Sequence, residues 1–222
     1  MDEVERVYAV LVAGGLALVP TCAGYGLVGM GGDAVERVYA LKGRPSTKPC
    51  ITVATAAVLD GVTTGIDPDV RDWILATTRS APLAVVAPLR SDAPAIERLE
   101  PAVRRQCTSD GTIAVFLNAG VLVTALAERA WAEGRLVVGS SANRSGAGNA
   151  YAPSEVTDAI RRGVDCVVDV GEVPRATPER LATTLLHLGS GRFLRRGIAA
   201  DAIERSWAVR RSRDEGAPVP SP

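Results

Sequence analysis

The sequence predicts an α/β fold, or an α+β fold with a mixed sheet, because short apolar runs alternate along the chain with segments that carry helical periodicity. Of the 222 residues, 47% are hydrophobic, which is enough for a substantial core. No internal repeat of fixed period interrupts the alternation.

In the first half of the chain, helix and strand signals follow one another. Residues 3–12 carry apolar side chains at helical spacing and stop at a Gly-Gly pair, and a buried strand then ends at Pro20. A glycine-rich turn, Gly24-Tyr25-Gly26, precedes a second helix, for which Asp33 is the expected N-cap. The elements expected in this part of the chain are the helix Glu3–Val12, the strand Leu16–Val19, the helix Ala34–Leu41 and the strand Ile51–Ala54.

Further along, Asp67-Pro68 is typical of an N-cap followed by proline in the first turn of a helix, here running to about Thr78. Pro101 should break or kink the helical segment 95–106, and Gly163 should end the segment 153–162. The remaining predicted strands are Leu83–Ala87, Thr112–Leu117, Leu136–Val138, Asp165–Val168, Thr184–Leu188 and Arg192–Leu194. The remaining predicted helices are Val121–Ala132 and Ala199–Trp207.

Composition limits the classes of function. No apolar run approaches the ~20 residues that span a membrane, and the acidic N-terminus differs from a signal peptide, so we expect a soluble, cytoplasmic protein without a membrane partner. The formal net charge of zero does not favour a large nucleic-acid surface. His187 is the only histidine, and the four cysteines form no C-x-x-C pair, so neither a metal site nor a His-based triad is expected. Cys22, beside the glycine turn, is the thiol to examine.

The chain uses lysine at only two positions, Lys42 and Lys48, which lie in one proline-punctuated loop with Arg44. Lysine is a compact charge that meets a phosphate from many angles, so this loop suggests a polyphosphate site. Two ordinary surface lysines would explain the pattern equally well.

A second polar segment, Ser140–Gly146, follows an apolar strand and reads S-S-A-N-R-S-G. Such a loop can wrap backbone N–H groups and hydroxyls around an anion, although it also suits a plain polar turn. Together with the lysine loop and Arg195/Arg196, it favours a nucleotide pocket.

Four motifs in this order resemble the YrdC-like family, whose best-known members are the L-threonylcarbamoyladenylate synthases. The resemblance runs from about Val4 to Ile198 and implies a twisted mixed sheet flanked by helices, with a basic concave face. The motifs are P-T-x-x-x-Y-G-L from Pro20, K-G-R-P…K-P from Lys42, S-S-A-N-R-S-G from Ser140 and F-L-R-R-G from Phe193.

The resemblance implies a nucleotidyltransferase that takes ATP as substrate, with Mg²⁺ arriving on the triphosphate, and that forms a carbamoyl adenylate from bicarbonate and an amine or amino acid. Lys42 and Arg44 would be the catalytic cations. The implied nucleotide-binding residues are Lys42, Arg44, Lys48, Ser141, Asn143 and Arg195. The implied amine-binding positions are Thr21, Ala23, Tyr25, Val53, Phe116 and Thr183.

The sequence departs from the family pattern on the amino-acid side. Cys22 and Ala23 replace an acidic residue and a threonine, Val53 stands where a histidine is usual, and Phe116 stands where a strand normally carries arginine. The first interpretation is that threonine is a poor substrate, and the second is that these are core residues of a diverged homologue. Another arginine, Arg90, Arg104 or Arg105, is the alternative source of the missing charge.

Three rival functions stay open: a housekeeping synthase for tRNA threonylcarbamoyladenosine modification, a carbamoyltransferase that handles carbamoyl adenylate in biosynthesis, and a non-catalytic RNA-binding protein. The acyl substrate, the downstream transferase and the oligomeric state are not predicted. We expect one domain, residues 1–207, followed by a disordered tail, residues 208–222, with a Pro- and Gly-rich end.

Overall fold

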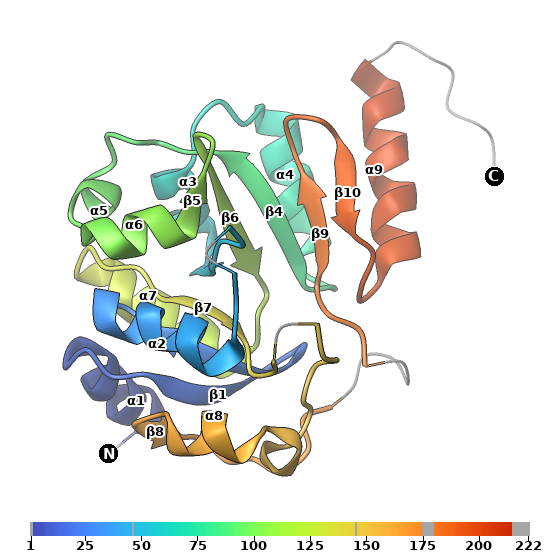
Figure 1. The fold of residues 1–222 in the computed structure, drawn as a ribbon. Coiled ribbons are helices and arrows are strands. Elements are labelled where there is room, and N and C mark those ends of the chain that lie inside the picture. Colours follow the sequence, from blue (N-terminus) through green and yellow to red (C-terminus); the bar gives the residue numbers. More distant parts are fainter. Residues whose placement is uncertain (1, 46, 145, 175–179, 215–222) are drawn as a thin grey trace.

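The structure, a computed structural model, describes residues 2–45, 47–144, 146–174 and 180–214, and describes residues 213 and 214 by their backbone alone. It is a mixed α/β fold in which helices flank one twisted sheet (Figure 1). Within the described residues, ten strands form this sheet in the order β10-β9-β4-β6-β3-β7-β2-β1-β8, with β5 paired to β6. The predicted fold class is confirmed.

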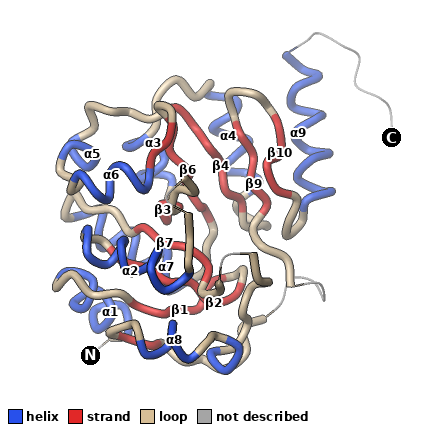
Figure 2. Tube along the Cα trace, viewed as in Figure 1, coloured by secondary structure: helices blue, strands red, loops and turns tan. Residues whose placement is uncertain are grey.

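Parallel and antiparallel pairs both occur in the sheet, and Figure 2 shows β1 and β2 toward one end with β9 and β10 toward the other. The strands are β1 Ala17–Thr21, β2 Gly24–Gly29, β3 Ile51–Ala54, β4 Leu83–Pro88, β5 Thr108–Ser109, β6 Thr112–Leu117, β7 Val138–Ser141, β8 Cys166–Val167, β9 Thr184–His187 and β10 Arg192–Arg195.

Most helices begin where the sequence predicts. The helices are α1 Glu3–Val12, α2 Gly32–Lys42, α3 Ala56–Val62, α4 Pro68–Thr77, α5 Pro94–Glu97, α6 Pro101–Cys107, α7 Val121–Ala132, α8 Asp158–Arg162 and α9 Ala200–Asp214, with a 3-10 turn at Pro153–Glu155. Asp67 caps α4 by accepting hydrogen bonds from the N–H groups of Asp69 and Val70. None of the helices in the described segments is both long and apolar enough to cross a membrane.

Several local predictions differ from the structure. The segment 153–162 forms a 3-10 turn at Pro153–Glu155 and then the short α8, because Val156 between them is extended. Gly24-Tyr25-Gly26 is not a turn but the start of β2, which pairs with β1 across a turn at residues 22 and 23. Asp33 does not cap α2. That helix begins at Gly32, whose N–H donates to Glu100 Oε2 at 3.1 Å, so a carboxylate from a distant segment takes the capping role. Helix α3, capped by Thr55, is absent from the prediction.

Both faces of the sheet are buried, and successive side chains of β1 pack into hydrophobic clusters on opposite faces. Leu18 belongs to a hydrophobic cluster that includes residues of α2, whereas Ala17 and Val19 belong to a second cluster with residues of α1 and α7. Val53 of β3 and Phe116 of β6 face this second cluster. The sheet therefore directs these two side chains toward the same side as α7.

The C-terminal boundary differs from the prediction. Helix α9 continues to Asp214, so a disordered tail that starts at residue 208 is wrong for residues 208–214. The Trp207 ring lies 4.7 Å from the Trp73 ring, measured between centroids, and Arg210 lies over Trp207 and within 3.4 Å of the Asp67 carboxylate. These contacts tie the last turns of α9 to the domain, and residues 215–222 lie outside the described residues.

Candidate functional site

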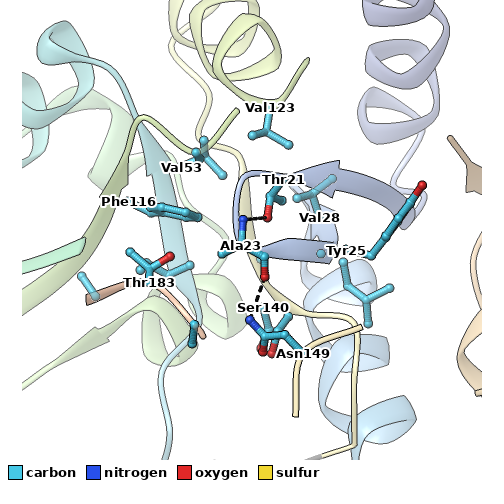
Figure 3. A pocket seen from close by; sticks show the side chains of 18 of the residues that line it. Thr21, Ala23, Tyr25, Val28, Val53, Phe116, Val123, Ser140, Asn149 and Thr183 are labelled. Atoms are coloured by element: carbon cyan, nitrogen blue, oxygen red, sulfur yellow. Dashed lines mark hydrogen bonds between the residues drawn. The ribbon is translucent and has the colours of Figure 1, made fainter. Parts of the chain in front are cut away.

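A cavity of about 200 Å³, called here the inner cavity, lies where β2, β3, β6 and β7 meet. All six amine-binding positions expected from the resemblance line it: Thr21, Ala23, Tyr25, Val53, Phe116 and Thr183. Val53 and Phe116 are direct partners in the parallel β3–β6 pair, so their side chains lie next to each other (Figure 3). The sheet register thus brings together residues that are far apart in the sequence.

Apolar groups dominate one wall of the inner cavity. Ala23, Val53, Phe116 and Val123 lie together in Figure 3, and each belongs to the cluster formed with α1 and α7. The charged residues that line the cavity are Arg44 and Arg195, and no acidic residue lines it in the described part of the chain. Arg90, Arg104 and Arg105 do not line it, so the structure does not bring any of these three arginines to the cavity as a replacement charge.

The hydroxyls near the cavity differ in their availability. The Tyr25 hydroxyl donates to Gly171 O at 2.9 Å, accepts from the Val170 N–H at 3.1 Å, and points away from the cavity in Figure 3. Thr21 Oγ1 donates to Gly24 O at 2.5 Å and accepts from the Ala23 N–H. The polar recognition expected from Tyr25 is therefore not supplied by its hydroxyl.

Thr183 differs from these two residues. It is buried just before β9, where it bridges to Ile198, and its hydroxyl makes no hydrogen bond to any described residue. Thr183 therefore keeps an unused hydrogen-bonding group at the cavity.

A wider hollow of about 970 Å³, the outer groove, adjoins the inner cavity and shares Arg44, Ser141, Asn149 and Arg195 with it. Among the described residues, six Lys or Arg side chains line this groove against one acidic residue, Asp110. Arg180 pairs with Glu155, and Arg196 pairs with Asp201 and Glu204. The other four cations have no acidic partner among the described residues: Lys42, Arg44, Lys48 and Arg195.

The four unpaired cations are those that the sequence motifs single out. Clustered like charges repel each other in a low-dielectric groove, so an anion that binds between them is stabilised by all of them. The outer groove is therefore suited to a polyanion, such as a polyphosphate chain.

Lys42, at the end of α2, is only 2% exposed. Its ammonium donates to Asn143 O at 2.6 Å and to Ser141 O, and lies 3.3–3.4 Å from Asn143 Oδ1 and Ser141 Oγ. Burial, followed by the charge of Arg44, lowers the pKa of Lys42 to about 8. The loop that contains Ser141 and Asn143, within Ser140–Gly146, is called here the polar loop. Lys42 thus holds the polar loop against α2, a role that the sequence motifs do not indicate.

Arg44 and Lys48 shape the other side of the groove. Arg44 donates from Nε to Lys48 O at 3.0 Å and from one terminal nitrogen to Pro49 O at 2.8 Å. Within the described chain its second terminal nitrogen has no partner. The Lys48 side chain is exposed.

Arg195 enters the site from β10. Its Nε donates to Thr183 O at 2.8 Å, and both terminal nitrogens have no partner among the described residues. Desolvation by the groove walls, followed by the charge of Arg44, lowers the pKa of Arg195. A guanidinium held by Nε alone presents its two free nitrogens to a ligand, which is the geometry that a carboxylate or phosphate accepts.

The polar loop is held by its own side chains. Ser141 Oγ donates to Asn143 Oδ1, and Asn143 Nδ2 donates to Ala147 O and, at 3.1 Å, to Arg144 O. Ser145, the third serine of the motif, lies outside the described residues. The Asn143 side chain therefore acts here as an internal brace of the loop.

Two residues at the site were missed from the sequence. Asn149 donates from Nδ2 to Ala23 O at 2.7 Å and lines both hollows, and Val123 of α7 closes the apolar wall. The signal for Asn149 was its place in the glycine-rich continuation of the polar loop. Val123 gave no signal, because it reads as an ordinary core residue of a helix.

Cys22 is not an activated thiol. Its Sγ donates to Asn118 O at 3.1 Å, and burial raises its pKa to about 12. The thiol therefore stays protonated at neutral pH and is a poor nucleophile. Among the described residues, no group of three His, Cys, Asp or Glu side chains is placed to hold a metal ion.

The fold and site define an α/β domain with a cationic groove that opens into a small apolar cavity. The chain belongs to the Sua5/YciO/YrdC family, described as telomere recombination, whose sequence profile matches residues 9–197. This confirms the resemblance to the YrdC-like family. No curated protein sequence matches the chain significantly.

Solved structures agree with the fold. The hypothetical protein smu.1377c from Streptococcus mutans UA159 is 18% identical, with a TM-score of 0.77 over 92% of this chain and 90% of that one. Sua5 from P. abyssi, complexed with L-threonine, is 25% identical, with a TM-score of 0.68 over 87% of this chain and 54% of that one. Full-length HypF in its phosphate- and nucleotide-bound form is 16% identical, with a TM-score of 0.67 over 89% of this chain and 29% of that one.

The chain therefore spans about half of Sua5 and less than a third of HypF.

Proposed function

We propose that this protein is an ATP-dependent nucleotidyltransferase that forms a carbamoyl adenylate from ATP, bicarbonate and an amine, and releases pyrophosphate. The observation that carries the proposal is the outer groove, which opens into the inner cavity. Four cations of this groove lack an acidic partner in the part of the chain that the structure describes: Lys42, Arg44, Lys48 and Arg195. Membership of the Sua5/YciO/YrdC family supports a carbamoyl-transfer or adenylate-related activity. The cytoplasm is the compartment that we propose.

The reaction needs no protein nucleophile. The amine nitrogen adds to the carbon of bicarbonate and water leaves, which produces a carbamate. A carbamate oxygen then bonds to the α-phosphorus of ATP while the bond to the bridging oxygen breaks, and that oxygen leaves with pyrophosphate. Charge neutralisation and positioning supply the catalysis, and these are what Arg44 and Arg195 offer at the junction of groove and cavity.

In this proposal the two substrates occupy different parts of the site. The triphosphate, with its Mg²⁺, lies along the outer groove near Arg44, Lys48 and Arg195, and the polar loop braced by Lys42 borders it. The amine occupies the inner cavity, beside Val53 and Phe116. The shared residues Arg44 and Arg195 lie where the two substrates meet.

Threonine is a second candidate for the amine. Sua5 from P. abyssi, which is 25% identical to this chain, was solved with L-threonine. The free hydroxyl of Thr183 offers one partner to a polar side chain in the cavity. A threonine product would support the housekeeping role in tRNA modification, with a downstream transferase as partner.

Two measurements test the proposal. Calorimetry should detect ATP binding that weakens at least tenfold in Arg195→Met, because charge-assisted hydrogen bonds contribute about 1.5–3 kcal/mol each. Pyrophosphate release should require ATP, bicarbonate and an amine together. Absence of ATP binding in the wild type would refute the proposal and leave an RNA-binding role, which filter binding of RNA measures directly.

A further inference from the structure

We infer that the amine substrate is an α-amino acid with a small branched aliphatic side chain, of the size and shape of valine, rather than threonine. The inference rests on the proposed function and names the substrate class of the same site. It follows from the wall of the inner cavity, the partners of its hydroxyls and the position of its two arginines.

The wall offers methyl and ring groups. Ala23, Val53 and Phe116 are each less than 10% exposed and lie together with Val123 around one side of the cavity. The parallel β3–β6 register places Val53 directly beside Phe116, so no polar side chain intervenes between them. A branched aliphatic side chain that enters this space replaces water at apolar surface, which is favourable.

Two hydroxyls of the cavity lining, those of Tyr25 and Thr21, are already engaged and offer little to a threonine side chain that faces the apolar wall. The Tyr25 hydroxyl is engaged with Gly171 O and the Val170 N–H, and Thr21 Oγ1 is engaged with Gly24 O. A hydroxyl that loses its water without gaining a partner is destabilised. Ser140 and Thr183 also line the cavity, and their hydroxyls have no partner among the described residues. In Figure 3 Thr183 lies below the Phe116 ring, and Ser140 lies beside Asn149, away from Val53 and Val123.

The arginines account for the carboxylate of an amino acid. Arg195 presents two terminal nitrogens that have no partner among the described residues, and Arg44 lies near enough for its charge to lower the pKa of Arg195. Both line the inner cavity as well as the outer groove, so one anion in the cavity and another in the groove can be held at their junction. A simple amine, or ammonia, carries no carboxylate, so the two arginines would then serve the triphosphate alone.

Valine and threonine provide a sharp test because they have the same shape and differ by one methyl-to-hydroxyl exchange. We expect kcat/KM for pyrophosphate release to be about ten- to a hundredfold higher with L-valine than with L-threonine, the range that a hydrophobic site achieves against such an isostere. L-Alanine and ammonium are measured alongside. Binding of the same compounds by calorimetry, with a non-hydrolysable ATP analogue present, provides a second readout.

Two variants test the cause of the preference. Val53→Thr adds a hydroxyl to the wall at constant shape and should shift the valine-to-threonine ratio toward threonine by at least threefold. Thr183→Val removes the unpartnered hydroxyl and should shift the ratio further toward valine. The matched control is Val121→Thr, the same exchange at a side chain 91% exposed at the start of α7, and it should leave the ratio unchanged.

The outcomes separate the inference from the proposed function. Pyrophosphate release with threonine preferred, or with ammonium as effective as valine, overturns the inference and leaves the proposed function standing. Tighter binding of valine without pyrophosphate release from any amine supports the inference about the cavity and refutes the proposed reaction. Equal binding of valine and threonine in wild type and both variants overturns the inference.

Discussion

Replacement of Lys42 by methionine removes one buried ammonium and keeps most of the side-chain volume. In the structure this ammonium donates to the carbonyls of Ser141 and Asn143, so its loss leaves two acceptors of the polar loop without their donor. An unsatisfied acceptor costs about 1–3 kcal/mol when it is buried. Because both residues border the groove and water can reach them, we expect the low end, about 1–2 kcal/mol of unfolding free energy in total.

The effect on ATP is expected to be larger than the effect on folding. Lys42 contributes its charge to the groove and holds the loop that borders the phosphates, and one charge-assisted interaction is worth about 1.5–3 kcal/mol. We therefore expect ATP affinity to fall about ten- to a hundredfold in Lys42→Met. The melting temperature should fall by only a few degrees, since about 1 kcal/mol shifts it by about 2–4 °C at this chain length.

Calorimetry at pH 7 measures the affinity, and hydrogen exchange at the amides of Ser141–Asn143 measures the loop. Lys48→Met is the matched control, because Lys48 is exposed in the same loop and a screened surface charge contributes about 0–1 kcal/mol. The expected loss of affinity in this control is at most about fivefold. Equal ATP affinity in wild type and Lys42→Met, with unchanged exchange in the loop, would refute the reasoning.

Three further predictions concern pH, the C-terminal helix and a glycine. Burial lowers the pKa of Lys42 to about 8, so the ATP affinity measured by calorimetry should decline as the pH rises above 8. In Lys42→Met the ATP affinity should not change with pH over the same range. Without ligand, the folded state holds fewer protons than the unfolded state between about 8 and 10.5, so the free energy of unfolding should rise through that window in denaturant titrations. Trp207→Ala should cost about 3–5 kcal/mol in urea unfolding, and truncation after Trp207, which removes Arg210, should lower the melting temperature relative to truncation after residue 214. Gly24→Ala should lower the free energy of unfolding in urea, because Gly24 has a φ of +95° and an added Cβ would lie 2.4 Å from Ala150 O. An unchanged free energy of unfolding would show that the β1–β2 hairpin moves to accept the methyl group.

Local signals predicted the elements that depend on nearby residues. The ends of α1, β3, β6 and α7 agree with the apolar patterns and turn residues around them, and Asp67 caps α4 as expected. Elements whose identity depends on a neighbour were missed. Strand β2 begins with Gly24-Tyr25-Gly26, which resembles a turn locally and becomes a strand because β1 and β7 pair with it on both sides.

The amino-acid sequence by itself determined the family and most of the alternation of helices and strands, and it singled out most of the cations and several of the apolar residues that line the two hollows, because these depend on residue type and on motifs that are contiguous in the chain. Only the tertiary structure decided what those residues do. The sheet register put Val53 beside Phe116, and the packing of α2 buried Lys42 against the polar loop. The partners of a side chain come from segments far apart in the sequence, so the turned-away hydroxyl of Tyr25 and the free nitrogens of Arg195 follow from the folded chain alone.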